Sequence, residues 1–245
     1  MARPRDPAKR EALLTAAAEL VAQLGPTASP AKIARQAGVS AGTIFVYFPT
    51  KDDLLNTLYV HLKANLRRHI HTSPEMPWPQ RMRRAWDDYI DWGFTHPLQA
   101  RALAVLSASE RVTPQTRAEA QTIFPEFEKW GAESRTPNSS EAVEAVGEGA
   151  PAGFLDASFY ALADMVIAHG TQQAEEAAKT GSGAADNKTA SAGKAGTEKT
   201  ATPVAEDSEL AERRERWRQA GYAMFWEYMQ RQPGESYFSA RLDFK

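Results

Sequence analysis

The stretch IARQAGVSAGTIFVYFPTKDDL, residues 33–54, decides the fold of the N-terminal part of the chain. It contains two short helical segments joined by Gly38-Val39-Ser40, and the second of them is expected over Ala41–Tyr47. The glycine permits a tight turn, Val39 fills the junction, and Ser40 is a favourable helix cap. Two short helices at such a turn are typical of a helix-turn-helix, whose second helix enters the major groove of DNA.

Helix signals continue on both sides of this stretch. Asp6-Pro7 predicts the start of a first helix that Gly25 ends, and Ser29-Pro30 predicts the start of the next. Thr50, with Asp53 three residues later, predicts a capping box at the start of a long fourth helix over Lys51–Ile70.

The remainder of the chain shows aromatic-rich helical spacing and no run of alternating β-branched residues. Strong helical patterns cover Phe154–Gly170 and Leu210–Tyr228. Residues 180–207 between them are Gly, Ala, Ser, Thr and charged residues with one large aliphatic, so we expect a disordered insert. The sequence therefore predicts an all-α protein.

Composition limits the function further. The 245 residues are 42% hydrophobic and 24% charged and include no cysteine, which excludes disulfides and thiol chemistry. No apolar run is long enough for a transmembrane helix or a signal peptide, so we expect a cytoplasmic protein without membrane contact. Residues 1–70 carry ten Lys and Arg and five Asp and Glu, whereas the whole chain has a net charge of −2. A basic head on an acidic body suits a nucleic-acid binder.

The pattern Ile33-Ala34-x-x-Ala37-Gly38-Val39-Ser40-x-Gly42-Thr43-x-x-x-Tyr47-Phe48-x-x-Lys51-x-x-Leu54 resembles the signature of the TetR (tetracycline-repressor-like) family. The resemblance is specific over residues 8–58 and concerns only the number and order of helices beyond them. It implies a helix-turn-helix DNA-binding head on a helical-bundle body that binds a ligand and dimerises.

The resemblance also implies roles for single residues. Positions that contact DNA phosphates in the family are occupied by Ser40, Thr43, Tyr47 and Lys51. Positions that face base edges are occupied by Ala41, Gly42 and Phe45. Phe48 matches an aromatic residue of the core and is not expected to touch DNA.

The chain departs from the family in the chemistry of its recognition helix. Residues 41–47 include no Arg, Lys, Asn, Gln, Asp or Glu, so the paired hydrogen bonds that distinguish guanine or adenine cannot come from this helix. We therefore expect Arg35 and Gln36, with Lys32, to contribute base or groove contacts. Arg3 and Arg5 are candidates for an arm that enters a minor groove.

In the body, the family resemblance implies a pocket between the middle helices. The aromatic side chains expected to form it are Trp86, Tyr89, Phe124, Phe127 and Phe159, which favours a small apolar or aromatic effector. We expect Asp87, Asp88 and Asp91, and the charge run Glu212–Arg218, to lie on solvated faces. Neither a catalytic constellation nor a metal site is expected, and no cofactor is predicted.

Together these observations predict a DNA-binding domain over 1–52 and a ligand-binding and dimerisation domain over 53–245, with the insert at 180–207. The helices Phe154–Gly170 and Leu210–Tyr228 are expected to form the homodimer interface, where the small residues Ala163, Gly170 and Gly221 would allow close approach. The predicted function is a ligand-responsive repressor whose dimer binds a palindromic double-stranded operator until an effector releases it. The alternatives are a helical enzyme or scaffold with a purely structural N-terminal hairpin, and a ligand-blind regulator or activator.

Overall fold

The computed structural model describes residues 6–73, 75–124, 154–182 and 208–230. Over these residues the chain forms helices and no strand, which confirms the all-α class. The elements are α1 (Pro7–Leu24), the short 3-10 helix η1 (Gly25–Thr27), α2 (Pro30–Gln36), α3 (Thr43–Tyr47), α4 (Lys51–Arg67), α5 (Trp78–Thr95), α6 (Pro97–Ser107), α7 (Pro114–Gln121), α10 (Phe154–Ser182) and α11 (Ser208–Gln230).

The helix ends follow from local chemistry. The Asp6 carboxylate accepts a hydrogen bond from the Ala8 N–H at 2.9 Å and caps α1, and Gly25 at φ 71° ends it in a backbone conformation that favours glycine. At α4, Thr50 and Asp53 form the predicted capping box, in which each side chain accepts from the other residue's backbone N–H.

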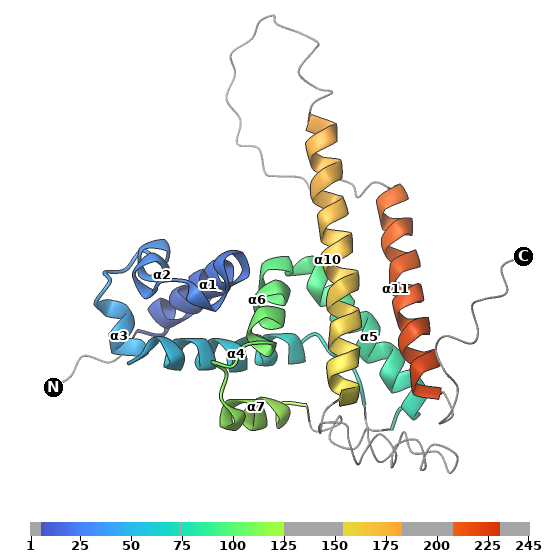
Figure 1. Cartoon of the computed structure of the whole chain (residues 1–245), viewed down its shortest axis with the longest axis horizontal. Coiled ribbons are helices and arrows are strands. Elements are labelled where there is room, and N and C mark those ends of the chain that lie inside the picture. The colour runs from blue at the N-terminus through green and yellow to red at the C-terminus, as the bar shows by residue number, and fades with distance from the viewer. Residues whose placement is uncertain (1–5, 74, 125–153, 183–207, 231–245) are drawn as a thin grey trace, which may run out of the picture.

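Figure 1 shows the arrangement of these elements. The helices α1, α2 and α3 form a head at one end of the molecule, and α4 runs from the head beneath α6 toward the body. The long helices α10 and α11 stand side by side at the other end, with α5 packed against both.

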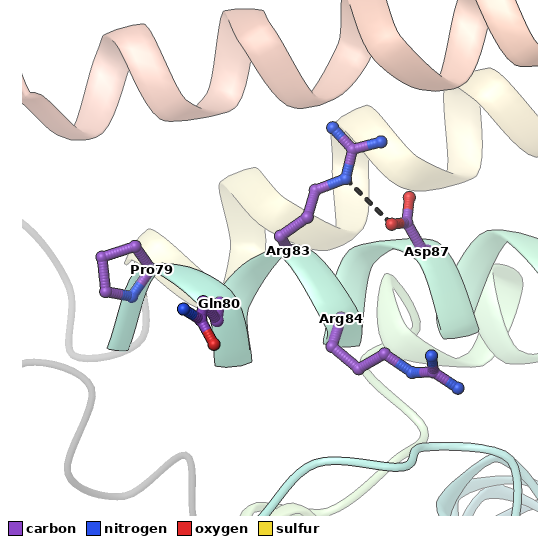
Figure 2. A pocket seen from close by; sticks show the side chains of 5 residues that line it. All are labelled: Pro79, Gln80, Arg83, Arg84 and Asp87. Atoms are coloured by element: carbon purple, nitrogen blue, oxygen red, sulfur yellow. Dashed lines mark hydrogen bonds and ion pairs between the residues drawn. The ribbon is translucent and has the colours of Figure 1, made fainter. Parts of the chain in front are cut away.

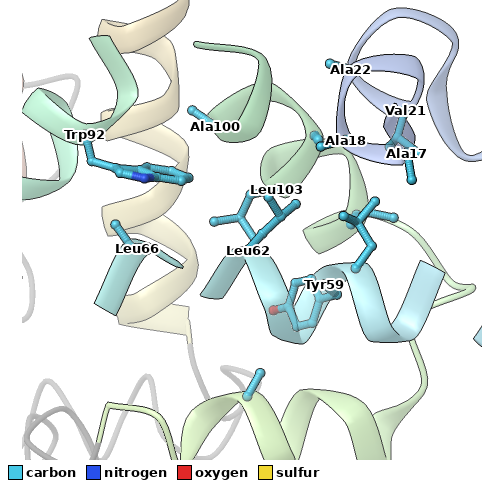
Figure 3. Close-up of a cluster of buried hydrophobic side chains, with 14 of the residues drawn as sticks. Ala17, Ala18, Val21, Ala22, Tyr59, Leu62, Leu66, Trp92, Ala100 and Leu103 are labelled. Atoms are coloured by element: carbon cyan, nitrogen blue, oxygen red, sulfur yellow. The ribbon is translucent and has the colours of Figure 1, made fainter. Parts of the chain in front are cut away.

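The head (α1–α3) and the body (α5–α11) share one core, because α1 packs closely on α6. The buried face of α1 is built largely from alanine, including Ala17, Ala18 and Ala22, and it meets Ala100 and Leu103 of α6. Side chains this small let two helix backbones approach closely. Figure 3 shows this seam above Leu62 and Tyr59 of α4, so the same cluster joins α1, α4 and α6.

Small residues also allow close packing among α5, α10 and α11. These contacts lie within one chain and not between two. A Cβ on Gly221 would come 2.8 Å from both the Trp86 ring and Val166, and one on Gly170 would come 2.6 Å from Phe94. Ala163 is likewise fully buried. The expectation that these residues allow close approach at the dimer interface is therefore wrong, because Phe94 and Trp86 of the same chain cover the two glycines and Ala163 is already buried within the chain.

Two expectations about charged side chains also need correction. Asp88 is buried rather than solvated, since it accepts the His71 N–H at 2.6 Å and pairs with Arg84 at 3.0 Å. Within the run Glu212–Arg218, Arg218 lies against α5 and pairs with Asp91. A buried charge needs such partners, because losing water without them is costly.

Some helix boundaries in the structure differ from those predicted from the sequence. Ala41 and Gly42 form a turn before α3, and α4 ends at Arg67 rather than Ile70. The helix α10 continues to Ser182, so residues 180–182 of the predicted disordered insert are helical, and 183–207 lie outside the described residues.

Candidate nucleic-acid interface

The turn between α2 and α3 depends on Gly38. Its φ of 70° lies in the left-handed region that residues with a side chain rarely adopt. The Gly38 N–H donates to the Arg35 carbonyl at 3.1 Å and the Val39 N–H to the Ala34 carbonyl at 2.9 Å, which satisfies the end of α2. This glycine thus allows α3 to leave at an angle to α2.

The short helix α3 has one buried and one exposed face. Ile44 is 1% exposed and packs into the head, while Phe45 and Val46 are 52% and 54% exposed. Ala41 and Gly42 are also exposed, so all three residues predicted to face bases are open to solvent, as is Val46. Sequence reasoning missed Val46. Its place two residues after the buried Ile44 would have indicated an outward direction on this helix.

The first phosphate-contact candidates lie at the start of α3. The Ser40 and Thr43 hydroxyl oxygens are 2.7 Å apart, and the Thr43 N–H donates to the Ser40 carbonyl at 2.9 Å. One hydroxyl donates to the other, and the second keeps a proton that can be donated outward. The pair is exposed to solvent.

Tyr47 is tied to the start of the chain. The Asp6 N–H donates to the Tyr47 hydroxyl oxygen at 3.1 Å. Because the phenol oxygen accepts this bond, its own O–H remains available as a donor to an anionic oxygen. Phe48, next along, is 3% exposed, as expected for a core residue, and Arg10 lies over its ring.

Lys51 occupies the first helical position of α4, where the helix dipole and the free N–H groups already favour an anion. Partial burial lowers the pKa of Lys51, and the nearby positive charge of Arg111 lowers it further. Arg111 belongs to the turn between α6 and α7 and pairs with Asp52 at 2.7 Å. Sequence reasoning missed Arg111, because no local signal places the α6–α7 turn beside the start of α4.

The flanking candidates on α2 have mixed surroundings. Lys32, Arg35 and Gln36 are all exposed, as groove contacts require. The Gln36 amide donates to the Glu19 carboxylate of α1, so it would have to leave this partner in order to reach a base. Arg3 and Arg5 lie outside the described residues.

In the body, three of the five predicted pocket residues line one small internal cavity. Its volume is about 10 Å³, close to that of a single water molecule. The cavity is lined by Leu66, Ile70, Ala85, Tyr89, Phe124, Phe159 and Tyr160. Trp86 instead donates its indole N–H to the Arg218 carbonyl at 3.1 Å and stacks on Phe225, and Phe127 lies outside the described residues.

Polar groups border this cavity. The Tyr89 hydroxyl donates to the Asp164 carboxylate at 2.7 Å. Burial raises the pKa of Asp164 to about 6, although this hydrogen bond and the charge of Lys63 act in the opposite direction. The Lys63 ammonium is buried and lies 4.0 Å from the centre of the Tyr160 ring. Two tyrosines of the cavity wall thus contact one acidic and one basic side chain.

A second, shallow hollow of about 370 Å³ lies on the outer surface of α5. Figure 2 shows that Arg83 and Asp87 pair across its edge, while Arg84 points away. Pro79 and Gln80 complete it. Because it is open to solvent and its charges are already paired, it offers little enclosure for a ligand.

Comparison with known proteins agrees with this geometry. Residues 13–58 match the family model described as bacterial regulatory proteins, tetR family. A TetR-family transcription regulator from Shewanella sp. PV-4 is 20% identical with a TM-score of 0.59, covering 90% of this chain and 97% of its own. One from Marinobacter aquaeolei VT8 is 18% identical with a TM-score of 0.57, covering 91% and 96%.

These matches confirm the resemblance drawn from the sequence. Residues 13–58 match the TetR family model, and the fold is similar to that of solved TetR-family transcription regulators. Within the described residues, no helix has the length and apolar character to cross a membrane.

Proposed function

We propose that this chain is a transcriptional repressor that binds a palindromic DNA operator as a homodimer and is released by a small apolar or aromatic effector. The observation that carries the proposal is the head itself. An exposed apolar face on α3 is flanked by hydroxyl donors at Ser40, Thr43 and Tyr47 and by the ammonium of Lys51. Such donors position a protein on the phosphate backbone.

Charge pairing near Lys51 supports contact with DNA. The first turn of α4 contains Asp52 and Asp53, whose carboxylates would repel phosphate. Asp53 is occupied by the capping box, and Asp52 by Arg111. The start of α4 can therefore approach DNA with its repulsion reduced.

The apolar face of α3 suggests how bases are distinguished. Phe45 and Val46 offer no hydrogen bonds, but they can contact the methyl group of thymine in the major groove. Arg35 is exposed on α2 and is a candidate for a polar contact. Sequence choice on this proposal depends on thymine methyls and DNA shape more than on paired hydrogen bonds.

Fluorescence anisotropy with labelled DNA from the region flanking the chain's own gene tests DNA binding. The wild type should bind with an affinity that falls steeply with salt. Lys51→Ala should lower the affinity, and it should lower the magnitude of the salt slope by about 1 for each subunit of the dimer. Arg101→Ala, an exposed cation on α6, is the matched control and should change neither. Salt-independent or absent binding by the wild type would contradict the proposal.

The same assay separates the contribution of the α3 face. Replacing thymine by uracil in the bound DNA removes only the methyl group, so it should weaken binding of the wild type. In Phe45→Ala the same replacement should have less effect. Equal losses in both proteins would show that Phe45 does not contact a thymine methyl.

Dimerisation is supported by the outer faces of α10 and α11. Met165 is 52% exposed on α10, and Trp217 and Met224 are 41% and 46% exposed on α11. Large apolar side chains gathered on two adjacent helices are typical of a surface that another chain covers. A second copy would also place two heads for the two halves of a palindrome.

Effector binding is supported by the cavity bordered by Tyr89, Phe124 and Phe159. At about 10 Å³ it is too small for an effector, which would have to separate α10, α5 and the segment after α7 to enter. Such an opening would move α4, because Leu66 in its last turn and Ile70 just beyond its end form part of the same wall. This supplies a physical link between ligand binding and the head.

A further inference from the structure

The side chain of Asn56, in the second turn of α4, bridges two distant parts of the chain. Its amide N–H donates to the Arg111 carbonyl at 2.9 Å, and its amide oxygen accepts the Thr113 N–H at 2.9 Å. Both partners belong to the turn between α6 and α7. The two ends of one amide thus hold two backbone groups in a fixed register.

Neighbouring contacts make this turn a rigid partner. From α7, the two Arg117 amino groups donate to the carbonyls of Ser107 and Ser109, each at 2.9 Å. The Thr113 hydroxyl caps α7 by accepting the Thr116 N–H at 3.2 Å. These hydrogen bonds fix the turn to α7. A movement of α7 would therefore also move the backbone groups of Arg111 and Thr113 that Asn56 binds.

Asn56 lies close to the start of α4, so the bridge acts near the end of the helix that carries Lys51. It lies five residues after Lys51, about 7.5 Å along the helix. On the other side, Phe124 follows α7 and lines the internal cavity. The bridge thus stands between the helix start that faces DNA and the segment that borders the cavity.

We propose that Asn56 is a positioning residue for DNA binding, which fixes the start of α4, and with it the head, against the α6–α7 turn. This proposal rests on the DNA-binding function proposed above and adds the element that sets the orientation of the head. Asn56 does not itself touch DNA. Its loss should lower operator affinity by widening the range of head orientations, while every phosphate contact remains available.

The test compares Asn56→Ala with the wild type on the same flanking DNA over a range of salt concentrations. We expect affinity to fall roughly 10-fold, within the 5- to 150-fold range typical of coupling between sites, with an unchanged salt slope. Lys51→Ala provides the contrast, because losing a phosphate contact changes the slope. If Asn56 only stabilised the fold, its loss would not lower the operator affinity while leaving the salt slope unchanged.

Asn65→Ala is the matched control. Asn65 is also on α4, and its amide donates to Gln99 of α6 at 3.0 Å, but it lies nine residues further from the head than Asn56. Circular dichroism should show both variants folded, and operator affinity should fall only for Asn56→Ala. Both substitutions place the best helix former in a helix, so α4 itself should persist.

Because the chain has no cysteine, a pair of introduced cysteines can report the orientation directly. Spin labels at Ala31 in the head and Arg101 in the body, both exposed, should give a broader distance distribution in Asn56→Ala than in Asn65→Ala. Identical distributions, or equal affinities for Asn56→Ala and wild type, would overturn the proposal. Failure of the wild type to bind DNA would instead overturn the proposed function.

Discussion

At the residue scale, the Ser40 and Thr43 hydroxyls are paired at the head, and Tyr89 and Asp164 are paired in the body. The first pair is exposed, so its cost in lost hydration is small. The second is buried, and there the loss of water governs the protonation of the carboxyl group.

The Asp164 carboxyl should make the stability of the fold depend on pH. Its folded pKa of about 6 lies above the ordinary value of 3.8, so the folded state holds a proton that the unfolded state has released between these values. This contribution is fully present below about pH 4 and is lost as pH rises through 6. The shift corresponds to about 3 kcal/mol at most.

Urea unfolding of wild type and Asp164→Asn between pH 4 and pH 7 measures this effect. The amide of the variant can still accept from Tyr89 but cannot ionise. The stability of the wild type should therefore fall relative to the variant as pH rises. Parallel pH profiles would show that Asp164 does not carry the proton.

At the scale of single elements, the helix-turn-helix depends on one backbone conformation. The region around Gly38 is open, with no atom within 4 Å of a built Cβ, so only the φ of 70° resists a side chain. Gly42 is equally open but has an ordinary φ of −75°. The two glycines therefore separate the effect of conformation from the effect of space.

Gly38→Ala should destabilise the protein by about 1–2 kcal/mol, because an L-residue is strained in the left-handed region. Gly42→Ala should be neutral or stabilise it by about 0.4–1 kcal/mol, since alanine restricts only the unfolded chain at a compatible position. Thermal or urea unfolding of both variants provides the measurement. Equal effects would mean that the turn does not require a positive φ.

At the scale of the whole molecule, the head is part of the same core as the body. The alanine face of α1 lies on α6, and α6 also contacts α4, α5 and α10. A change between α5 and α10 can thus reach the head through packed helices. Met165, Trp217 and Met224 on α10 and α11 lie outside this core, and in the proposed dimer a second copy would cover them.

Sedimentation tests that outer face. Met165→Glu places a charge on the exposed surface of α10 and should shift the protein from twice the mass of one chain toward a single chain, because burying an unpaired carboxylate is costly. Leu98→Glu, at a comparably exposed apolar residue of α6, should leave the mass unchanged. A wild type that sediments as a single chain would contradict the proposed dimer.

By itself, the sequence determined the helices, their caps and the identity of the head. These features depend on neighbours in the chain: Thr50 caps with Asp53 three residues away, and Gly38 ends α2 where it stands. The family resemblance likewise placed Phe48 in the core, and its side chain is 3% exposed. Because these interactions join residues that are close together in the chain, their patterns are visible in the sequence.

Only the tertiary structure decided which distant groups meet. Gly170 and Gly221 face aromatic rings of the same chain rather than a partner, and Asn56 holds the backbone of a turn more than fifty residues away. Asp88 looked like a surface charge in the sequence and is buried with Arg84 and His71. Such contacts arise from how whole helices cross and pack, and no pattern within one helix specifies what the neighbouring helix will place against it.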